Sequence, residues 1–122
     1  MTKILLLTLF IAIFPLSSYA ETTETFKGRK YIAEITSHCE EGNVSCKNVT
    51  LISKSIKTKK SIELKGETVN INCPRACDFR GYTFKNKNYI YTLLSDDHQL
   101  NKWNYIIMKD NKIISKDYGV IE

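Results

Sequence analysis

Four cysteines carry the clearest chemistry in this 122-residue chain, and they form an even set: Cys39, Cys46, Cys73 and Cys77. Cys73 and Cys77 bracket Pro74, with three intervening residues and strand-like sequence on both sides. A redox dithiol usually has two intervening residues and opens a helix, so this spacing does not favour redox chemistry. We expect two structural disulfides, which are typical of small exported domains.

The pairing of these cysteines is not fixed by the sequence, because four cysteines allow three connectivities. We favour the local pairs, Cys39 with Cys46 and Cys73 with Cys77, since Glu40–Asn43 looks like a hairpin loop that would bring Cys39 and Cys46 together. Each small ring would stabilise the fold by about 2 to 2.5 kcal/mol. A long-range pair such as Cys39 with Cys73 would contribute about 4 kcal/mol.

Histidine and carboxylate chemistry is sparse, because His38 and His98 are the two histidines of the chain and lie far apart in sequence. A zinc site or an acid–base pair would have to use Asp96 and Asp97 beside His98, and adjacent loop residues rarely converge on one reacting atom. No nucleophile motif or phosphate-binding glycine loop is present. We expect no catalytic residue, no metal and no cofactor; a small secreted hydrolase or toxin that uses His98 with Asp96 or Asp97 is the alternative.

Aromatic residues supply a candidate binding surface. Tyr89, Tyr91, Trp103 and Tyr105 fall on two consecutive predicted strands. Most aromatic rings in a domain of this size belong to the core, but outward-facing Tyr89 and Tyr91 would form a cross-strand patch with Trp103 or Tyr105. The sequence does not fix which face is buried, because apolar residues such as Ile90 occupy the other face as well. These four residues are candidates for partner binding.

Lysines gather around one predicted turn, at positions 54, 57, 59, 60 and 65. Lys57, Lys59 and Lys60 are candidates for a charged flank of the binding surface, which would affect association rate more than affinity. The stretch Lys54–Lys65 could also contact an anionic surface or guard an edge strand as a solvated hairpin. No aromatic residue is interleaved among these lysines, so we expect no nucleic-acid binding.

The remaining chain reads as strands, since isoleucine, threonine and tyrosine are abundant and alanine is rare beyond residue 20. Alternating apolar residues and turn signals predict strands at about residues 29–39, 45–56, 62–64, 69–73, 79–84, 89–94, 103–108 and 112–115. Gly81 marks an expected bulge or close backbone approach, and Asp110-Asn111 an expected hairpin turn. We expect an all-β fold: one small domain, an antiparallel meander of about eight short strands forming a sandwich or barrel, with two disulfides.

The first 20 residues indicate export. Lys3 precedes an apolar run of about a dozen residues, and small residues stand before a cleavage site after Ala20. The run is shorter than the roughly 20 residues needed to span a bilayer, so we expect no transmembrane segment. Residues 1–20 are predicted to be a cleaved signal peptide and residues 21–122 a single β domain in the periplasm or extracellular space.

The function expected from these features is binding rather than catalysis. After removal of Lys3, 17 Lys and Arg stand against 13 Asp and Glu, a mildly basic balance. We expect an exported, non-catalytic binding protein whose partner is another protein, with an inhibitor or immunity protein as the type. A structural protein of the cell envelope is a further alternative to the hydrolase or toxin.

Overall fold

The structure, a computed structural model, describes residues 21–40 and 42–122, so the predicted signal peptide (residues 1–20) lies outside the described residues. The described residues form eight β-strands and no helix. The strands are β1 (Thr22–Lys27), β2 (Tyr31–Ser37), β3 (Val49–Ser55), β4 (Ser61–Ile71), β5 (Asp78–Asn86), β6 (Tyr89–Ser95), β7 (Lys102–Lys109) and β8 (Lys112–Ile121).

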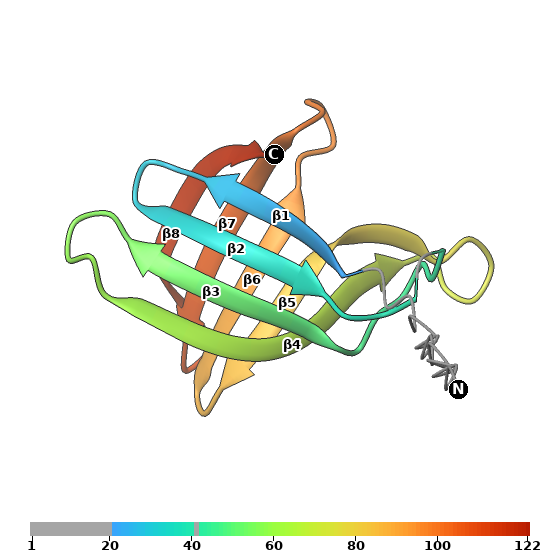
Figure 1. Ribbon diagram of the computed structural model, residues 1–122, viewed down its shortest axis with the longest axis horizontal. Coiled ribbons are helices and arrows are strands. Elements are labelled where there is room, and N and C mark those ends of the chain that lie inside the picture. Colours follow the sequence, from blue (N-terminus) through green and yellow to red (C-terminus); the bar gives the residue numbers. More distant parts are fainter. Residues whose placement is uncertain (1–20, 41) are drawn as a thin grey trace, which may run out of the picture.

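The strands close into a barrel in which neighbours in sequence are also neighbours in the sheet, all of them antiparallel (Figure 1). The ring is completed by β1 and β8, where Phe26 pairs with Ile121. Beyond the ladder, the backbone N–H groups of Thr25 and Glu122 each donate to the other's carbonyl oxygen at 3.0 Å. The predicted all-β meander is confirmed, and of the two architectures left open the fold is a barrel.

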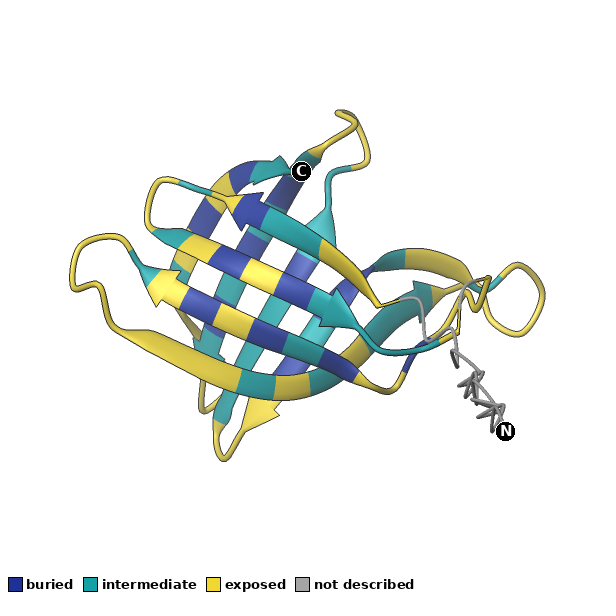
Figure 2. Cartoon of the chain, viewed as in Figure 1, coloured by how far each residue is buried: buried dark blue, intermediate teal, exposed yellow. Residues whose placement is uncertain are grey.

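The core of the barrel follows from strand alternation, because successive side chains point to opposite faces of a strand. Figure 2 shows this as alternating buried and exposed bands along β2 and β3. Residues that face inward from all around the barrel are fully buried; the largest are Tyr105, Phe26, Phe84, Ile35, Leu51, Leu93 and Val49. One continuous core therefore lies inside the barrel.

Two strand predictions were wrong. β1 was not predicted, although Thr22–Lys27 is rich in threonine and contains Phe26. The predicted third and fourth strands are one strand, β4, which runs through Gly66. A Cβ at Gly66 would clash with the ring of Phe84 and the carbonyl oxygen of Thr83. This glycine therefore makes room for a core aromatic ring and does not end a strand.

The bulge expected at Gly81 is confirmed. The register between β4 and β5 shifts between Val69 and Asn70, where Val69 pairs with Gly81 and Asn70 with Phe79. A Cβ at Gly81 would also clash with the carbonyl oxygen of Leu93 on β6. The glycine serves both purposes that its position suggested, since it permits the irregular register and the close approach of a neighbouring backbone.

Both predicted disulfides are confirmed, Cys39 with Cys46 and Cys73 with Cys77. They lie in the β2–β3 and β4–β5 loops, at the same end of the barrel. Two disulfides are consistent with folding in an oxidising compartment of the kind that exported proteins meet. Across the residues that the structure describes, there is no helix with the length and apolarity needed to cross a membrane.

Candidate functional site

Four short turns meet at the end of the barrel opposite the disulfides, which we call the mouth: residues 28–30, 56–60, 87–88 and 110–111. Backbone hydrogen bonds tie neighbouring turns together. Ile56 N donates to the carbonyl of Lys30 at 2.9 Å, and Asp110 N donates to the carbonyl of Asn88 at 3.1 Å. Asp110 and Asn111 have φ values of 49° and 64°, so the hairpin turn predicted there is confirmed.

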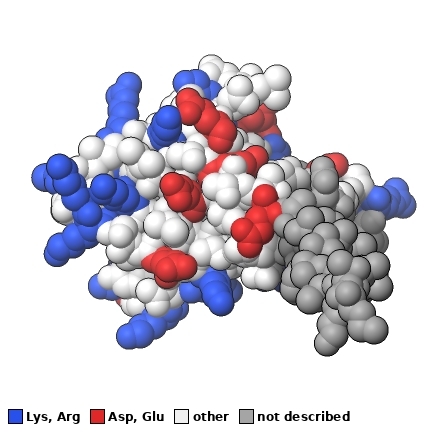
Figure 3. Space-filling view, in the orientation of Figure 1, with Lys and Arg blue, Asp and Glu red and all other residues white. Residues whose placement is uncertain are grey.

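Eight exposed cationic side chains surround the mouth and are here called the basic rim: Arg29, Lys30, Lys57, Lys59, Lys60, Lys87, Lys109 and Lys112. Figure 3 shows Lys and Arg gathered at the left of the molecule, where the β1–β2 and β3–β4 turns lie in Figure 1. In these four turns the exposed carboxylate is that of Asp110, which accepts a hydrogen bond from Asn88 Nδ2 at 2.9 Å. The mouth is therefore strongly positive.

The cations of the basic rim have no ion-pair partner within the described part of the chain. The ion pairs found there are Lys27–Glu122, His38–Glu21 and Arg80–Asp97, and none involves the rim. Like charges held together by short turns raise the local electrostatic potential. The arrangement can attract anions and speed their encounter with this end of the barrel.

Inside the basic rim the barrel opens into a pocket of about 240 Å³, here called the mouth pocket. Three tyrosines, four hydroxyl residues and one rim lysine contribute polar groups to its wall: Tyr31, Tyr89, Tyr91, Ser53, Ser55, Thr58, Ser115 and Lys60. The rest of its lining is isoleucine, and no Asp or Glu lines it. The mouth of a β-barrel is a common position for a ligand site.

The tyrosine rings of the mouth pocket are fixed by packing. The Tyr89 and Tyr91 rings stack with 6.3 Å between centroids, and Lys109 Nζ lies 5.4 Å from the Tyr89 centroid. The Tyr31 ring packs against the buried Tyr105 ring at 5.2 Å. Rings held in this way present their hydroxyl groups from defined positions.

Hydrogen bonds fix the base of the pocket. Tyr105 OH donates to Ser53 Oγ at 2.8 Å, and the hydroxyl groups of Tyr31 and Ser115 lie 3.0 Å apart. The Tyr91 hydroxyl has no hydrogen-bond partner among the described residues. Burial, reinforced by the neighbouring Tyr89 and Tyr31, raises the pKa of Tyr91, so its hydroxyl stays protonated at neutral pH.

The structure divides the aromatic residues singled out in the sequence between the two ends of the barrel. Tyr89 and Tyr91 line the mouth pocket together with Lys60, while Trp103 and Tyr105 are 7 % and 0 % exposed. Trp103 packs toward the disulfide end, with its ring centroid 6.0 Å from that of Tyr82. The prediction that these four residues form one exposed aromatic patch is therefore wrong, because all four side chains lie on the inner face of β6 and β7.

The lysines singled out in the sequence also separate. Lys57, Lys59 and Lys60 belong to the β3–β4 turn and to the basic rim. Lys54 pairs across strands with Ile32, and Lys65 with Thr50, on the outer face of the barrel. Only part of the stretch from 54 to 65 therefore faces the mouth.

Five polar residues of the mouth pocket were not singled out from the sequence: Tyr31, Ser53, Ser55, Thr58 and Ser115. Alternation alone places Tyr31 on the face of Ala33 and Ile35. Its hydroxyl meets Ser115, however, 84 residues further along the chain. That contact requires closure of the barrel, which no local pattern predicts.

The loop proposed for acid–base chemistry is engaged in structural contacts. Asp96 accepts hydrogen bonds from His98 N at 2.9 Å and from Tyr118 OH at 3.1 Å, and these bonds lower the pKa of Asp96. Asp97 forms an ion pair with Arg80. Both carboxylates thus have partners that hold the β6–β7 loop.

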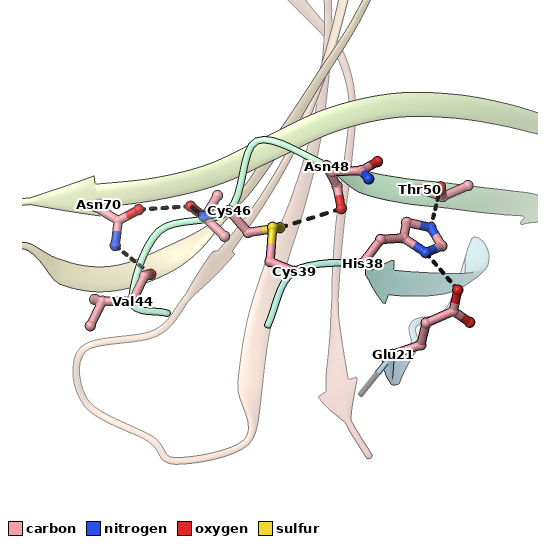
Figure 4. The surroundings of a disulfide bond; sticks show 9 residues. Glu21, His38, Cys39, Val44, Cys46, Asn48, Thr50 and Asn70 are labelled. Carbon is pink, nitrogen blue, oxygen red and sulfur yellow. Dashed lines mark hydrogen bonds and ion pairs between the residues drawn. A yellow bond between two sulfur atoms is a disulfide. The ribbon is translucent and has the colours of Figure 1, made fainter. Parts of the chain in front are cut away.

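His38 is likewise engaged, beside the Cys39–Cys46 disulfide (Figure 4). Its Nδ1 lies 2.9 Å from Glu21 Oε1 and its Nε2 2.8 Å from Thr50 Oγ1. Within residues 21–40 and 42–122, no three His, Cys, Asp or Glu side chains gather as a metal site would require. The disulfide end has a pocket as well, of about 400 Å³, but Glu24 and Glu40 line it, whereas no carboxylate lines the mouth pocket.

Comparison of the chain with models of protein families, with curated proteins and with solved structures found no match.

Proposed function

We propose that this chain is an exported, non-catalytic binding protein that captures an acidic partner protein with the mouth of its barrel. The observation that carries the proposal is the basic rim, whose eight cations have no ion-pair partner within the described residues and surround a pocket without a carboxylate. A matching acidic surface would supply the missing charge.

The two parts of the mouth would act differently in such a complex. The rim lysines are exposed and flexible, so each adds little affinity, while together they steer the approach of an acidic surface. The mouth pocket holds partly buried tyrosines, and tyrosine is among the residues enriched at the energetic centres of protein interfaces. Rate would thus depend on the rim and residence time on the pocket.

A charge-reversal pair tests this proposal. Lys57→Glu with Lys59→Glu alters the basic rim, and Lys65→Glu with Lys116→Glu makes the same change in net charge on the outer faces of β4 and β8. Each variant and the unaltered protein serve as bait for the exported proteins of the producing cells. We expect one protein to be captured by the unaltered chain and the outer-face variant, and lost with the rim variant.

The captured protein is then purified and its binding kinetics measured. The rim variant should slow association roughly tenfold or more at low salt, and added salt should reduce the difference. Equal loss of capture in both variants would show that total charge decides binding. Capture that survives in the rim variant would place the binding surface elsewhere. Either result contradicts the proposal.

A further inference from the structure

The mouth pocket is smaller than a usual site for a drug-sized ligand, and its polar side chains are hydroxyl groups and one ammonium group, all of which can donate hydrogen bonds. Pockets that enclose a drug-sized molecule are commonly about 300 to 1,000 Å³. At about 240 Å³ the mouth pocket falls below that range, so a single side chain of a partner suits it better than a whole cofactor.

The hydroxyl oxygens at the pocket are already used as acceptors. Ser53 Oγ accepts from Tyr105 OH at 2.8 Å. In the β3–β4 turn, Ser55 Oγ accepts from Thr58 N at 3.4 Å and Thr58 Oγ1 accepts from Lys60 N at 3.3 Å. None of these three hydroxyl groups donates a hydrogen bond to another of the described residues. The hydrogen of each is therefore available to a ligand.

Further donors line the same space. The hydroxyl groups of Tyr31 and Ser115 form one hydrogen bond with each other, which uses one of their two hydrogens. The other hydrogen remains available to a ligand. Tyr91, protonated at neutral pH, has no hydrogen-bond partner among the described residues. The Lys60 ammonium adds a charge and three donors that no carboxylate of the described chain neutralises. The pocket is therefore rich in donors and lacks an anion.

We propose that the mouth pocket is a carboxylate-binding subsite that receives one glutamate or aspartate side chain of the acidic partner protein. This inference rests on the proposed function and adds to it the identity of the anchoring group. An ionised carboxylate is an acceptor with about four lone-pair sites and forms strong hydrogen bonds with hydroxyl and ammonium donors. Its methylene groups would contact the isoleucines Ile62, Ile107 and Ile114 of the pocket wall.

The residues that line the subsite explain why it would prefer a carboxylate to a phosphate or sulfate. Those larger anions interact most strongly with arginine forks or with backbone amide groups at a helix terminus, and the pocket is lined by neither. A carboxylate on a flexible side chain can enter the space that has the stacked pair of rings, Tyr89 and Tyr91, on one side and the β3–β4 turn on the other. The surrounding rim would then contact the rest of the acidic surface.

The test uses the disulfide-bonded protein and two capped amino acids, N-acetyl-glutamate methylamide and its glutamine counterpart, which differ in charge and hardly in size. Amide chemical shifts are followed by NMR at pH 7 and constant ionic strength. We expect the glutamate compound to shift the amides of Ser55, Thr58, Lys60, Tyr91 and Ser115 in a saturable way. The glutamine compound should leave them unchanged at the same concentration.

Paired variants identify the donors. Tyr91→Phe removes a hydroxyl group that makes no internal hydrogen bond and should weaken glutamate binding about threefold to tenfold. Lys60→Gln should weaken it about tenfold. Tyr118→Phe and Lys47→Gln make the same chemical changes away from the mouth and should leave glutamate binding unchanged.

Three results would overturn the subsite. Equal shifts with glutamate and glutamine would remove the requirement for charge, and shifts spread over all exposed lysines would show an unspecific ion atmosphere. Unchanged binding in both Tyr91→Phe and Lys60→Gln would place the carboxylate elsewhere. If the rim still captures a partner in that case, the proposed function stands without the subsite. If glutamate binds the pocket but no partner depends on the rim, the subsite stands and the proposed function fails.

Discussion

The two ends of the barrel are held together by different means. At the disulfide end the connecting loops are long, residues 38–48, 72–77 and 96–101, and two of the three contain a disulfide. At the mouth the turns are short and contain no cysteine. Short turns restrict their own geometry, whereas long loops gain order from cross-links and side-chain hydrogen bonds.

The mouth has its own anchor, a buried carboxylate. Asp117 is 5 % exposed, and its oxygens accept backbone N–H bonds from Arg29 at 3.1 Å, Lys30 at 2.9 Å, Tyr31 at 3.0 Å and Tyr118 at 2.9 Å. Gly28 leaves room for this carboxylate, since a Cβ there would clash with Asp117. One internal anion thus holds the β1–β2 turn from which two cations of the rim project.

Charge is divided between the ends in the same way. The three loops of the disulfide end contain four acidic residues, Glu40, Glu41, Asp96 and Asp97, against Lys47 and Arg75. The mouth turns contain Asp110 as their one carboxylate, surrounded by the basic rim. A modest net charge therefore conceals a separation of charge along the barrel, and such a separation attracts anionic groups toward the mouth.

The largest effect is expected from removal of the anchor of the mouth. Asp117→Ala should lower the free energy of unfolding by about 3 to 5 kcal/mol, because several backbone N–H groups would lose a charged acceptor in a buried setting. Asp117→Asn keeps one acceptor oxygen and should cost less. Urea unfolding of both variants measures the difference; a loss below about 1 kcal/mol for Asp117→Ala would mean that the turn is held by other contacts.

A smaller effect is expected from removal of either disulfide at the opposite end. Replacing Cys39 and Cys46 with alanine should destabilise the protein by about 2.5 kcal/mol, and replacing Cys73 and Cys77 by about 2 kcal/mol, because the second ring is shorter. Amide shifts at the mouth should stay the same in both variants. Large shifts at Lys60 or Tyr91 would show that the two ends are coupled, contrary to the comparison above.

The parts of the fold that were predictable are those whose contacts join residues close together in the sequence. The Asp110-Asn111 turn and the bulge at Gly81 depend on a few neighbouring residues, so composition and spacing were sufficient to predict them. Spacing favoured the local disulfide pairs but did not exclude the other two connectivities. The prediction of eight strands was correct in number only because one missed strand, β1, was offset by the division of β4 into two. Gly66 was predicted to end a strand. Its role is to make room for the ring of Phe84, its cross-strand partner, which lies 18 residues away in sequence.

The mouth pocket was predictable only in fragments. Tyr89, Tyr91 and Lys60 were singled out, but as parts of an exposed face and its flank. Their convergence depends on the closure of β1 against β8 and on which face of β6 points inward, and both faces of that strand carry apolar residues. Asp117 was not singled out at all, because a lone aspartate in a strand has no local signature of burial.

The smallest expected effect is on stability at alkaline pH, and it compares Tyr82 at the disulfide end with Tyr91 at the mouth. Tyr82, at the disulfide end, donates its hydroxyl hydrogen to Glu24 Oε2 at 3.0 Å. Burial first, and then the charge of Glu24, raise the pKa of Tyr82 above its ordinary value of about 10. The fold therefore retains a proton that the unfolded chain releases, so this contribution to stability is complete below pH 10 and is lost as the pH rises further.

We expect the free energy of unfolding to fall between pH 10 and pH 11, by less than about 1.4 kcal/mol for each such tyrosine. Tyr82→Phe should flatten this decline, and Glu24→Gln should flatten it partly, because it removes the charge but not the burial. Tyr91→Phe at the mouth should flatten it less, since Tyr91 is more open and lacks a carboxylate partner. Urea unfolding across this pH range gives the slope of the free energy of unfolding against pH for each variant. If Tyr91→Phe flattened the slope more than Tyr82→Phe, the tyrosine at the mouth would contribute more of the pH dependence, contrary to this prediction.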